Sequence, residues 1–225
     1  MAWEQKKQEK PQVLIVIPCS SGSVNLEWAM RLSQVWRKAP SGTKIQTLPE
    51  PQIDAARCKG IEIGLQMGVE NIFFWDADVQ PPPDIIAKLL AHNKPIVSAL
   101  YARRYEPPWL EMLKQKPEGL TPLYEGDYEK GALVECDAIG MGCCLIKTSL
   151  LKEIEKPWFQ WTNYYAADGA SEDFSFCRKV KRAGFKIYVD TSLICPHAGQ
   201  IKFMPSPKGG HNFELMNNTG LFSLE

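Results

Sequence analysis

The sequence lacks any long hydrophobic run and any excess of one charge. No apolar stretch approaches the roughly 18 residues that a membrane-spanning helix needs. Lysine plus arginine and aspartate plus glutamate each number 26, so no global field favours nucleic acid or an anionic membrane as a partner. The first ten residues are polar and charged, which is not typical of a secretory signal. We therefore expect a cytoplasmic chain with no transmembrane segment.

Paired-cysteine motifs and the common phosphate-binding signatures are also missing. None of the seven cysteines forms a C-x-x-C pair, so buried free thiols are expected rather than disulfides or zinc ligands. The segment from Pro18 to Ser23 follows a predicted strand but matches neither G-x-G-x-x-G nor G-x-x-x-x-G-K-[ST]. A Rossmann dinucleotide site and a P-loop are therefore unsupported, although these small residues would let a nucleotide approach the backbone.

Strand and helix patterns alternate through the first half of the sequence. Apolar runs predict strands at 13–17, 44–48, the run ending at Trp75, and 95–100. Helices are predicted at 25–38, 53–67 and from Pro83-Asp84 onward. The apolar spacing of the first helix runs through Leu26, Ala29, Met30, Leu32, Val35 and Trp36. This alternation predicts βαβ units and an α/β fold with a mostly parallel central sheet.

The second half is less regular. Residues 103–130 show no clear period and are predicted to cross the sheet as a long excursion. Strands are expected at 132–137, 143–147 and 186–189, and a helix at about 172–183. Prolines and glycines after residue 200 predict a loop-like, flexible tail at 200–225, which we interpret as a candidate lid over bound donor.

The most informative stretch is a short aromatic strand that ends in Asp76-Ala77-Asp78. Aspartates are poor strand formers and are costly to bury unpaired, so two of them at the end of a core strand need a reason. A hard divalent cation bound with substrate phosphates is the commonest one, and the carboxyl ends of parallel strands are where ligands collect. The alternative is a turn with an aspartate cap before Pro81-Pro82-Pro83.

Three further groups are candidates for chemistry. Glu172 and Asp173 open a predicted helix behind Ser171, where the helix dipole alone accounts for them, but where one could also act as a general base. His197 follows the last predicted strand, and imidazole suits manganese better than magnesium, although an ordinary surface histidine is the alternative. Arg57 has the fork geometry that suits phosphate, as do many solvated surface arginines.

Taken in order, these features resemble the nucleotide-sugar-dependent glycosyltransferases of the GT-A fold, in particular the family 2-like group. The resemblance covers roughly residues 13–197. The matching pieces are Val13 to Pro18, Asp54-Ala55-Ala56-Arg57, Phe74 to Asp78, Asp137 to Gly142, Cys144-Leu145-Ile146, Glu172 to Cys177 and His197. It implies a GT-A-type, Rossmann-like three-layer sandwich in one domain (1–225), with a nucleotide-binding half at about 11–100 and an acceptor half at about 101–199.

The same resemblance implies a role for each matched residue. Asp78 and His197, with Asp76, would hold Mn²⁺ or Mg²⁺. Asp173 would be the base of an inverting hexosyltransferase, and Glu172 would hold the acceptor. The donor site, for a UDP- or GDP-linked sugar, would be formed by Pro18, Ser20, Arg57, Asp76, Ala77, Asp78, Gly140, Met141 and Gly142. The acceptor would carry a hydroxyl on a glycan, lipid or small molecule.

Three alternatives remain open from the sequence. A retaining glycosyltransferase would share the fold and the D-x-D motif. A sugar nucleotidyltransferase would use a related sheet, but its glycine-rich, arginine-containing loop is missing from Pro18 to Asn25. A non-catalytic carbohydrate- or nucleotide-binding domain is the third alternative, and the presence of Asp76, Asp78, Asp173 and His197 counts against a decayed site.

Overall fold

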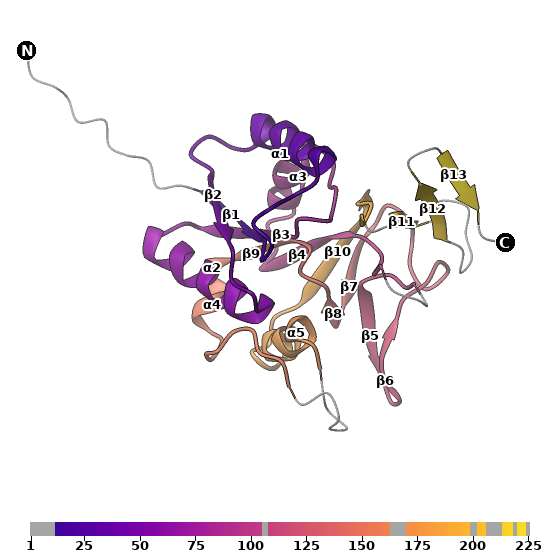
Figure 1. The fold of residues 1–225 in the computed structure, drawn as a ribbon. Coiled ribbons are helices and arrows are strands. Elements are labelled where there is room, and N and C mark those ends of the chain that lie inside the picture. The colour runs from indigo at the N-terminus through magenta and orange to yellow at the C-terminus, as the bar shows by residue number, and fades with distance from the viewer. Residues whose placement is uncertain are drawn as a thin grey trace, which may run out of the picture.

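A mixed seven-stranded sheet forms the centre of the computed structural model. The structure describes residues 12–104, 108–162 and 170–198, and the backbone of 202–205, 213–217 and 220–223. The strands are β1 (Val13–Pro18), β2 (Lys44–Leu48), β3 (Asn71–Trp75), β4 (Ile96–Leu100), β7 (Leu133–Cys136), β9 (Cys143–Lys147) and β10 (Ile187–Ile194). Their order is β2-β1-β3-β9-β4-β10-β7 (Figure 1). β9 runs antiparallel to both neighbours and β7 antiparallel to β10, while the other five strands share one direction. The predicted α/β fold with most strands parallel is therefore confirmed.

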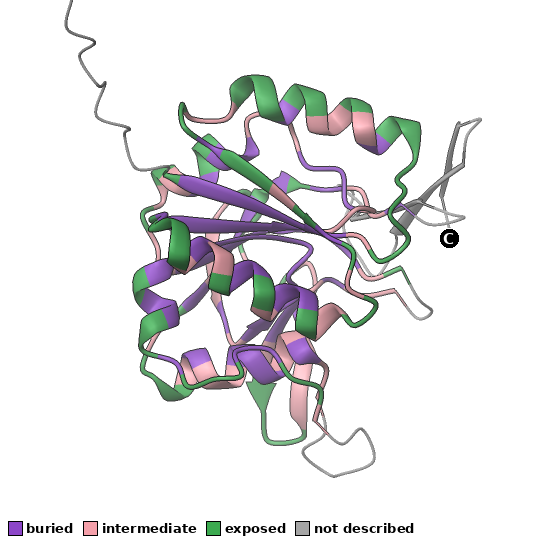
Figure 2. Cartoon of the chain, turned by 60° about the vertical axis from the view of Figure 1, so that its left-hand side comes forward, coloured by how far each residue is buried: buried purple, intermediate pink, exposed green. Residues whose placement is uncertain are grey.

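Helices cover both faces of this sheet (Figures 1 and 2). One face carries α1 (Leu26–Lys38) and α3 (Ile85–Ala91), and the other carries α2 (Ile53–Met67), α4 (Thr148–Lys152) and α5 (Glu172–Arg182). Alternate residues of β3 therefore enter different cores: Phe73 packs with α1 and α3, and Phe74 with α2, α4 and α5. Burial on both faces explains why the central strands are continuously apolar.

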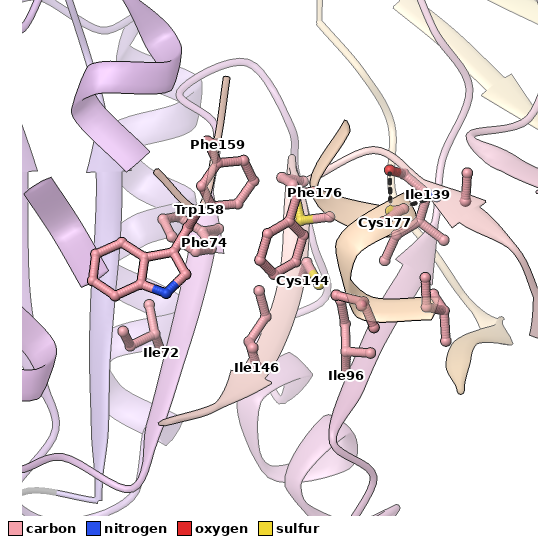
Figure 3. Packing of buried hydrophobic residues seen from close by; sticks show 14 of the residues in the cluster. Ile72, Phe74, Ile96, Ile139, Cys144, Ile146, Trp158, Phe159, Phe176 and Cys177 are labelled. Atoms are coloured by element: carbon pink, nitrogen blue, oxygen red, sulfur yellow. Dashed lines mark hydrogen bonds between the residues drawn. The ribbon is translucent and has the colours of Figure 1, made fainter. Parts of the chain in front are cut away.

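The core between the sheet and α5 is built from aromatic rings (Figure 3). Phe159 stacks on Phe176 with ring centroids 4.4 Å apart, and Phe74 meets Phe159 edge-on at 5.5 Å. On α2, glycine allows a close approach to the strands, because a Cβ at Gly60 would lie 2.6 Å from Cγ1 of Val16. This contact fixes α2 and hence its polar residue Arg57, which points toward the end of the sheet.

The helix α1 lies where the sequence predicts it, but its buried face is different. Asn25 caps it by accepting a hydrogen bond from the backbone N–H of Trp28 at 2.7 Å. Trp28 and Val35 are the buried residues, whereas Leu26, Met30 and Trp36 are 76%, 57% and 46% exposed. The apolar spacing that predicts the helix therefore includes three residues that are not buried.

Two other predictions need correction, and one helix has no prediction. Residues 103–130, predicted to be irregular, contain the hairpin of β5 (Met112–Lys116) and β6 (Gly119–Pro122), which forms a second sheet with β8 (Ala138–Ile139). The helix α4 carries no sequence prediction. The tail is predicted to be loop-like, but its described backbone forms the antiparallel strands β11 (Lys202–Pro205), β12 (Phe213–Asn217) and β13 (Gly220–Ser223). Pro205 is compatible with a strand because it ends an edge strand.

Two expectations from composition can be compared with the structure. All seven cysteines are free thiols, as predicted. In the described part of the chain, no helix has the length and apolar character needed to cross a bilayer. The predicted lid falls largely on residues outside the described ranges.

Candidate active site

A cavity of about 1030 Å³ opens where β1, β3, β4 and β10 end. Parallel strands bring the residues that follow them to the same edge of a sheet. The cavity is lined by the predicted residues Pro18, Ser20, Arg57, Asp76, Ala77, Asp78, Glu172, Asp173 and His197. The sheet order therefore brings together side chains that are more than 170 residues apart in the sequence.

Arg57 lies at the centre of three carboxylates. Its side chain on α2 is 3% exposed; Nη2 donates to both oxygens of Asp76 at 3.0 and 3.2 Å, and Nη1 donates to Glu172 at 2.5 Å and also to Asp173. Burial disfavours the charged guanidinium, but Asp173, Asp76 and Glu172 together raise the pKa of Arg57 above its ordinary value. The side chain is a permanent cation that joins the end of β3 to the start of α5.

The aspartate turn after β3 is held by its backbone. The N–H of Asp76 donates to the carbonyl of Gly142 at 3.0 Å, and its carbonyl accepts from the N–H of Val79 at 3.1 Å and from Nε1 of Trp28 at 3.2 Å. These contacts tie the turn to β9 and to α1. The two aspartate side chains therefore leave a fixed turn rather than a free loop.

Asp78 and His197 form the second polar pair of the site. Oδ1 of Asp78 lies 3.3 Å from Nε2 of His197, while Nδ1 of the same imidazole lies 2.8 Å from the carbonyl oxygen of Ala102. Burial raises the pKa of Asp78, but the hydrogen bond and charge of His197, with Arg104 next, bring it below its ordinary value. Burial likewise lowers the pKa of His197, and the contact with Asp78 outweighs this and raises it.

Asp173 has the electrostatics of a carboxylate that readily takes a proton. Ser171 caps α5 by accepting from the N–H of Phe174 at 3.4 Å, so Glu172 and Asp173 occupy the first turn. Burial and the charges of Glu172 and Asp76 raise the pKa of Asp173 well above its ordinary value, against the opposing effect of Arg57. A raised pKa is what a general base working near neutral pH needs.

Gly140, Met141 and Gly142 lie beneath the cavity rather than on its wall. The N–H of Met141 donates to Oδ2 of Asp173 at 3.3 Å, and the N–H of Gly142 donates to the hydroxyl of Tyr101 at 2.8 Å. A Cβ at Gly140 would lie only 2.2 Å from that hydroxyl, so no larger residue fits. This floor supports both Asp173 and the aspartate turn.

Sequence reasoning misses one titratable cavity residue, Glu111. It lies in the segment predicted to be irregular, and burial raises its pKa to about 7 although His197 and Arg103 act in the opposite direction. Arg103 and Arg104, which follow a strand end as phosphate-suited arginines would, and Trp109, an aromatic residue that could stack on a sugar, also line the cavity. The guanidinium of Arg103 lies 3.0 Å from the ring centroid of Trp109, and Arg104 pairs with Asp78. No periodic pattern marks Glu111, because it follows β4 in an aperiodic stretch.

The two tryptophans near α5 have different environments. Trp158 is 3% exposed and donates from Nε1 to the carbonyl of Leu151 at 2.8 Å, so it is a core residue. Trp161 is 50% exposed and lines the cavity. Thr162, which follows it, is tied to Ala170 by hydrogen bonds of 2.7 and 3.2 Å. Of the two tryptophans, Trp161 is the one that a ligand in the cavity can contact.

The predicted metal ligands line one cavity, but their side chains do not all converge on a single position for an ion. Within residues 12–104, 108–162 and 170–198, no three His, Cys, Asp or Glu side chains converge as a metal-binding group. Asp78 and His197 face one another, whereas both oxygens of Asp76 contact Arg57. Two protein ligands suit a hard cation that completes its shell with substrate oxygens and water.

Comparisons with known proteins identify a shared fold but do not assign the chain to a family. No protein-family model matches the chain, and no curated protein matches it. The chain is similar to a crystal structure of A197 from STIV, with 22% identity and a TM-score of 0.58 over 95% of this chain and 98% of that one. It is also similar to a mannose-1-phosphate geranyltransferase from Thermus thermophilus, with 11% identity and a TM-score of 0.44 over 80% of this chain and 73% of that one. The first likeness shows a shared fold, and the second is too low to carry an argument.

Proposed function

We propose that this chain is a metal-dependent, inverting glycosyltransferase of the GT-A type that moves a sugar from a nucleoside-diphosphate sugar to an acceptor hydroxyl. The observation that carries the proposal is the single cavity that unites Asp76, Asp78 and His197 with Asp173. Such a reaction needs charge compensation at a departing diphosphate and a base at the acceptor. Asp78 and His197 are the candidates for the first requirement, and Asp173 is the candidate for the second.

The chemistry of Asp78 and His197 fits a divalent metal. Nδ1 of His197 is held by the carbonyl of Ala102, and Nε2 faces Oδ1 of Asp78 at 3.3 Å. Loss of the Nε2 proton would make the lone pair of that nitrogen available to a metal. When bound there, Mn²⁺ or Mg²⁺ would neutralise charge on the departing diphosphate. Arg104 pairs with Oδ2 of Asp78, whereas Oδ1 is the oxygen that faces His197.

Asp173 supplies the base. It takes the proton of the acceptor hydroxyl while the acceptor oxygen bonds to the anomeric carbon, and the bond from that carbon to the diphosphate oxygen breaks with its electron pair leaving on the diphosphate. Its raised pKa supports this role, and the N–H of Met141 fixes its orientation. Glu172, bound to Arg57 at 2.5 Å and nearly buried, acts through the arginine.

The donor nucleotide is proposed to lie over the loop after β1. Pro18 and Ser20 line this part of the cavity, and the surrounding residues are small and polar. Arg57 keeps Asp76 in a fixed orientation at its edge. The contacts available are mostly backbone and hydroxyl groups, which do not select between a UDP-linked and a GDP-linked sugar.

The experiment is a donor screen with a defined loss-of-function control. Thermal shifts are measured for UDP- and GDP-sugars with Mn²⁺ or Mg²⁺, and hydrolysis of the stabilising donor is then followed. Metal-dependent stabilisation and hydrolysis that disappear in Asp78→Ala support the proposal. A donor that binds but is never cleaved by wild type, even with a panel of glycan and lipid acceptors, indicates a binding domain.

Two enzyme alternatives are separated by product analysis. The anomeric configuration of the product, read by NMR, distinguishes inversion from retention. Release of pyrophosphate from a nucleoside triphosphate and a sugar phosphate would indicate a nucleotidyltransferase. The small-residue loop from Pro18 to Asn25, without an arginine, favours the glycosyltransferase.

A further inference from the structure

The outer face of α1 concentrates exposed apolar side chains. Eight large hydrophobic residues in the described chain are exposed, and four of them lie in α1 or in the two residues before it. We call these four the α1 face: Val24, Leu26, Met30 and Trp36. Clusters of this kind on a surface mark a site of interaction.

The helix geometry makes the three α1 members a continuous strip. At 100° per residue, Leu26, Met30 and Trp36 fall within about a third of the helix circumference. The buried residues Trp28 and Val35 fall on the opposite side. Figure 2 shows α1 exposed along this outer side. Packing against the sheet therefore does not account for the three apolar side chains.

The charges around the α1 face have mainly one sign. Arg31, Arg37 and Lys38 belong to the same helix, and Glu27 is the one acidic residue among 24–38. On the neighbouring α3, Asp84 is paired with Lys88 at 3.1 Å. The whole chain is balanced at 26 cations and 26 anions, so this local excess is not a consequence of composition.

We infer that the α1 face binds the surface of an anionic lipid bilayer. Leu26, Met30 and Trp36 would enter the headgroup region, and the surrounding lysine and arginine side chains would pair with lipid phosphates and carboxylates. Apolar side chains flanked by basic ones on a surface helix are typical of such binding. A second copy of the chain is a poorer occupant, because two such faces would oppose cation to cation.

The bilayer would lie at the mouth of the cavity. Val24 belongs to the α1 face, is 41% exposed and also lines the cavity, together with Ser23 and Asn25 before the helix. This geometry rests on the fold and stands whether or not the cavity transfers a sugar. The test therefore uses binding, with no catalytic readout.

The full chain is sedimented with vesicles of phosphatidylcholine alone and with vesicles that also contain phosphatidylserine. The test variant is Leu26→Ser/Met30→Ser/Trp36→Ser. The matched control is Met67→Ser/Ile194→Ser, which removes apolar side chains that are 37% and 38% exposed elsewhere on the surface. We expect wild type and control to bind the anionic vesicles equally, and the test variant to bind at least tenfold more weakly. Arg37→Glu/Lys38→Glu should lower binding in a salt-dependent manner.

Four results would overturn the inference. The first is wild type that fails to sediment with anionic vesicles, and the second is a test variant that binds them as well as the control does. Equal binding to neutral vesicles shows that the charges play no part. A wild-type dimer in scattering measurements that the test variant converts to monomer assigns the face to self-association. Circular dichroism checks that each variant is folded, and single serine variants, each expected to weaken binding severalfold, replace the triple variant if it is not.

Discussion

Asp78 and His197 are held together by the backbone as well as by their side chains. The N–H of Ala198 donates to the carbonyl of Asp78 at 2.6 Å, and the N–H of Gln80 donates to the carbonyl of Pro196 at 2.8 Å. Val79 and His197 thus form an antiparallel bridge between segments after β3 and β10. The two proposed metal ligands are positioned by the fold before any ion arrives, which reduces the entropy cost of binding it.

Replacement of His197 should weaken metal binding. We expect His197→Ala to reduce Mn²⁺ affinity by at least about tenfold, because it removes one of two protein ligands. The measurement is a Mn²⁺ titration by electron paramagnetic resonance in the presence of nucleoside diphosphate. His92→Ala is the control, since His92 pairs with Asp190 at 2.7 Å and does not line the cavity. Equal losses in the two variants would contradict the proposed site.

Asp173→Asn should abolish transfer without preventing donor binding. Loss of a general base costs about 10²–10⁴ in kcat. Because the base must be deprotonated, wild-type kcat should fall as the pH drops through the pKa of Asp173, at a pH above that of an ordinary aspartate. Steady-state kinetics across pH give both the loss of kcat in the variant and the pH at which the wild-type kcat falls. A variant that retains kcat, with the same acid limb, would assign the base elsewhere.

Arg57→Met should destabilise the protein. The variant leaves Asp76, Glu172 and Asp173 close together without their cation, and loss of one partner of a buried ion pair costs about 3–5 kcal/mol. Urea unfolding at pH 7 gives the loss in free energy, which should shrink at lower pH as the carboxylates protonate. Lys59→Met is the control: its partner is Glu50, its side chain is 55% exposed, and the expected loss is below about 1 kcal/mol. Equal losses in both would show that the three-carboxylate contact is not stabilising.

Glu111→Gln should change how stability depends on pH. The pKa of Glu111 is raised to about 7 in the folded protein, so the folded state retains a proton that the unfolded chain has lost. Its contribution is complete below the unfolded pKa of about 4.3 and is lost as the pH rises to 7. The difference in unfolding free energy between wild type and variant should therefore shift in favour of the variant by up to about 3 kcal/mol between pH 4 and 8. A difference independent of pH would show that Glu111 is not perturbed.

The sequence predicts well where one local pattern decides the structure. The bounds of β2 and α2 agree with the predicted ranges, because apolar spacing and Gly68, which ends α2 at φ 68°, act locally. The placement of aspartates beyond β3 follows from parallel topology. The contact of Arg57 with Glu172 and Asp173 spans more than 110 residues, and no local pattern encodes it.

Other features escape prediction because composition is ambiguous. Residues 112–122 have too few β-branched residues to predict the hairpin that follows Glu111 and positions it. On α1, periodicity identifies the helix, but its apolar residues occupy two sides, and only packing decides that Trp28 and Val35 face the sheet.

The position of β9 between β3 and β4 has a consequence for biosynthesis. When the ribosome has made residues 1–100, β1 can pair with β2 and with β3. β3 still lacks its other neighbour, β9, and β4 lacks both of its neighbours, β9 and β10. Residues 1–100 therefore cannot complete their part of the sheet until residues 143–147 emerge and insert between strands already made. A fragment that ends near residue 100 should leave one edge of β3 and both edges of β4 unpaired and should aggregate, and the whole sheet should fold as one cooperative unit.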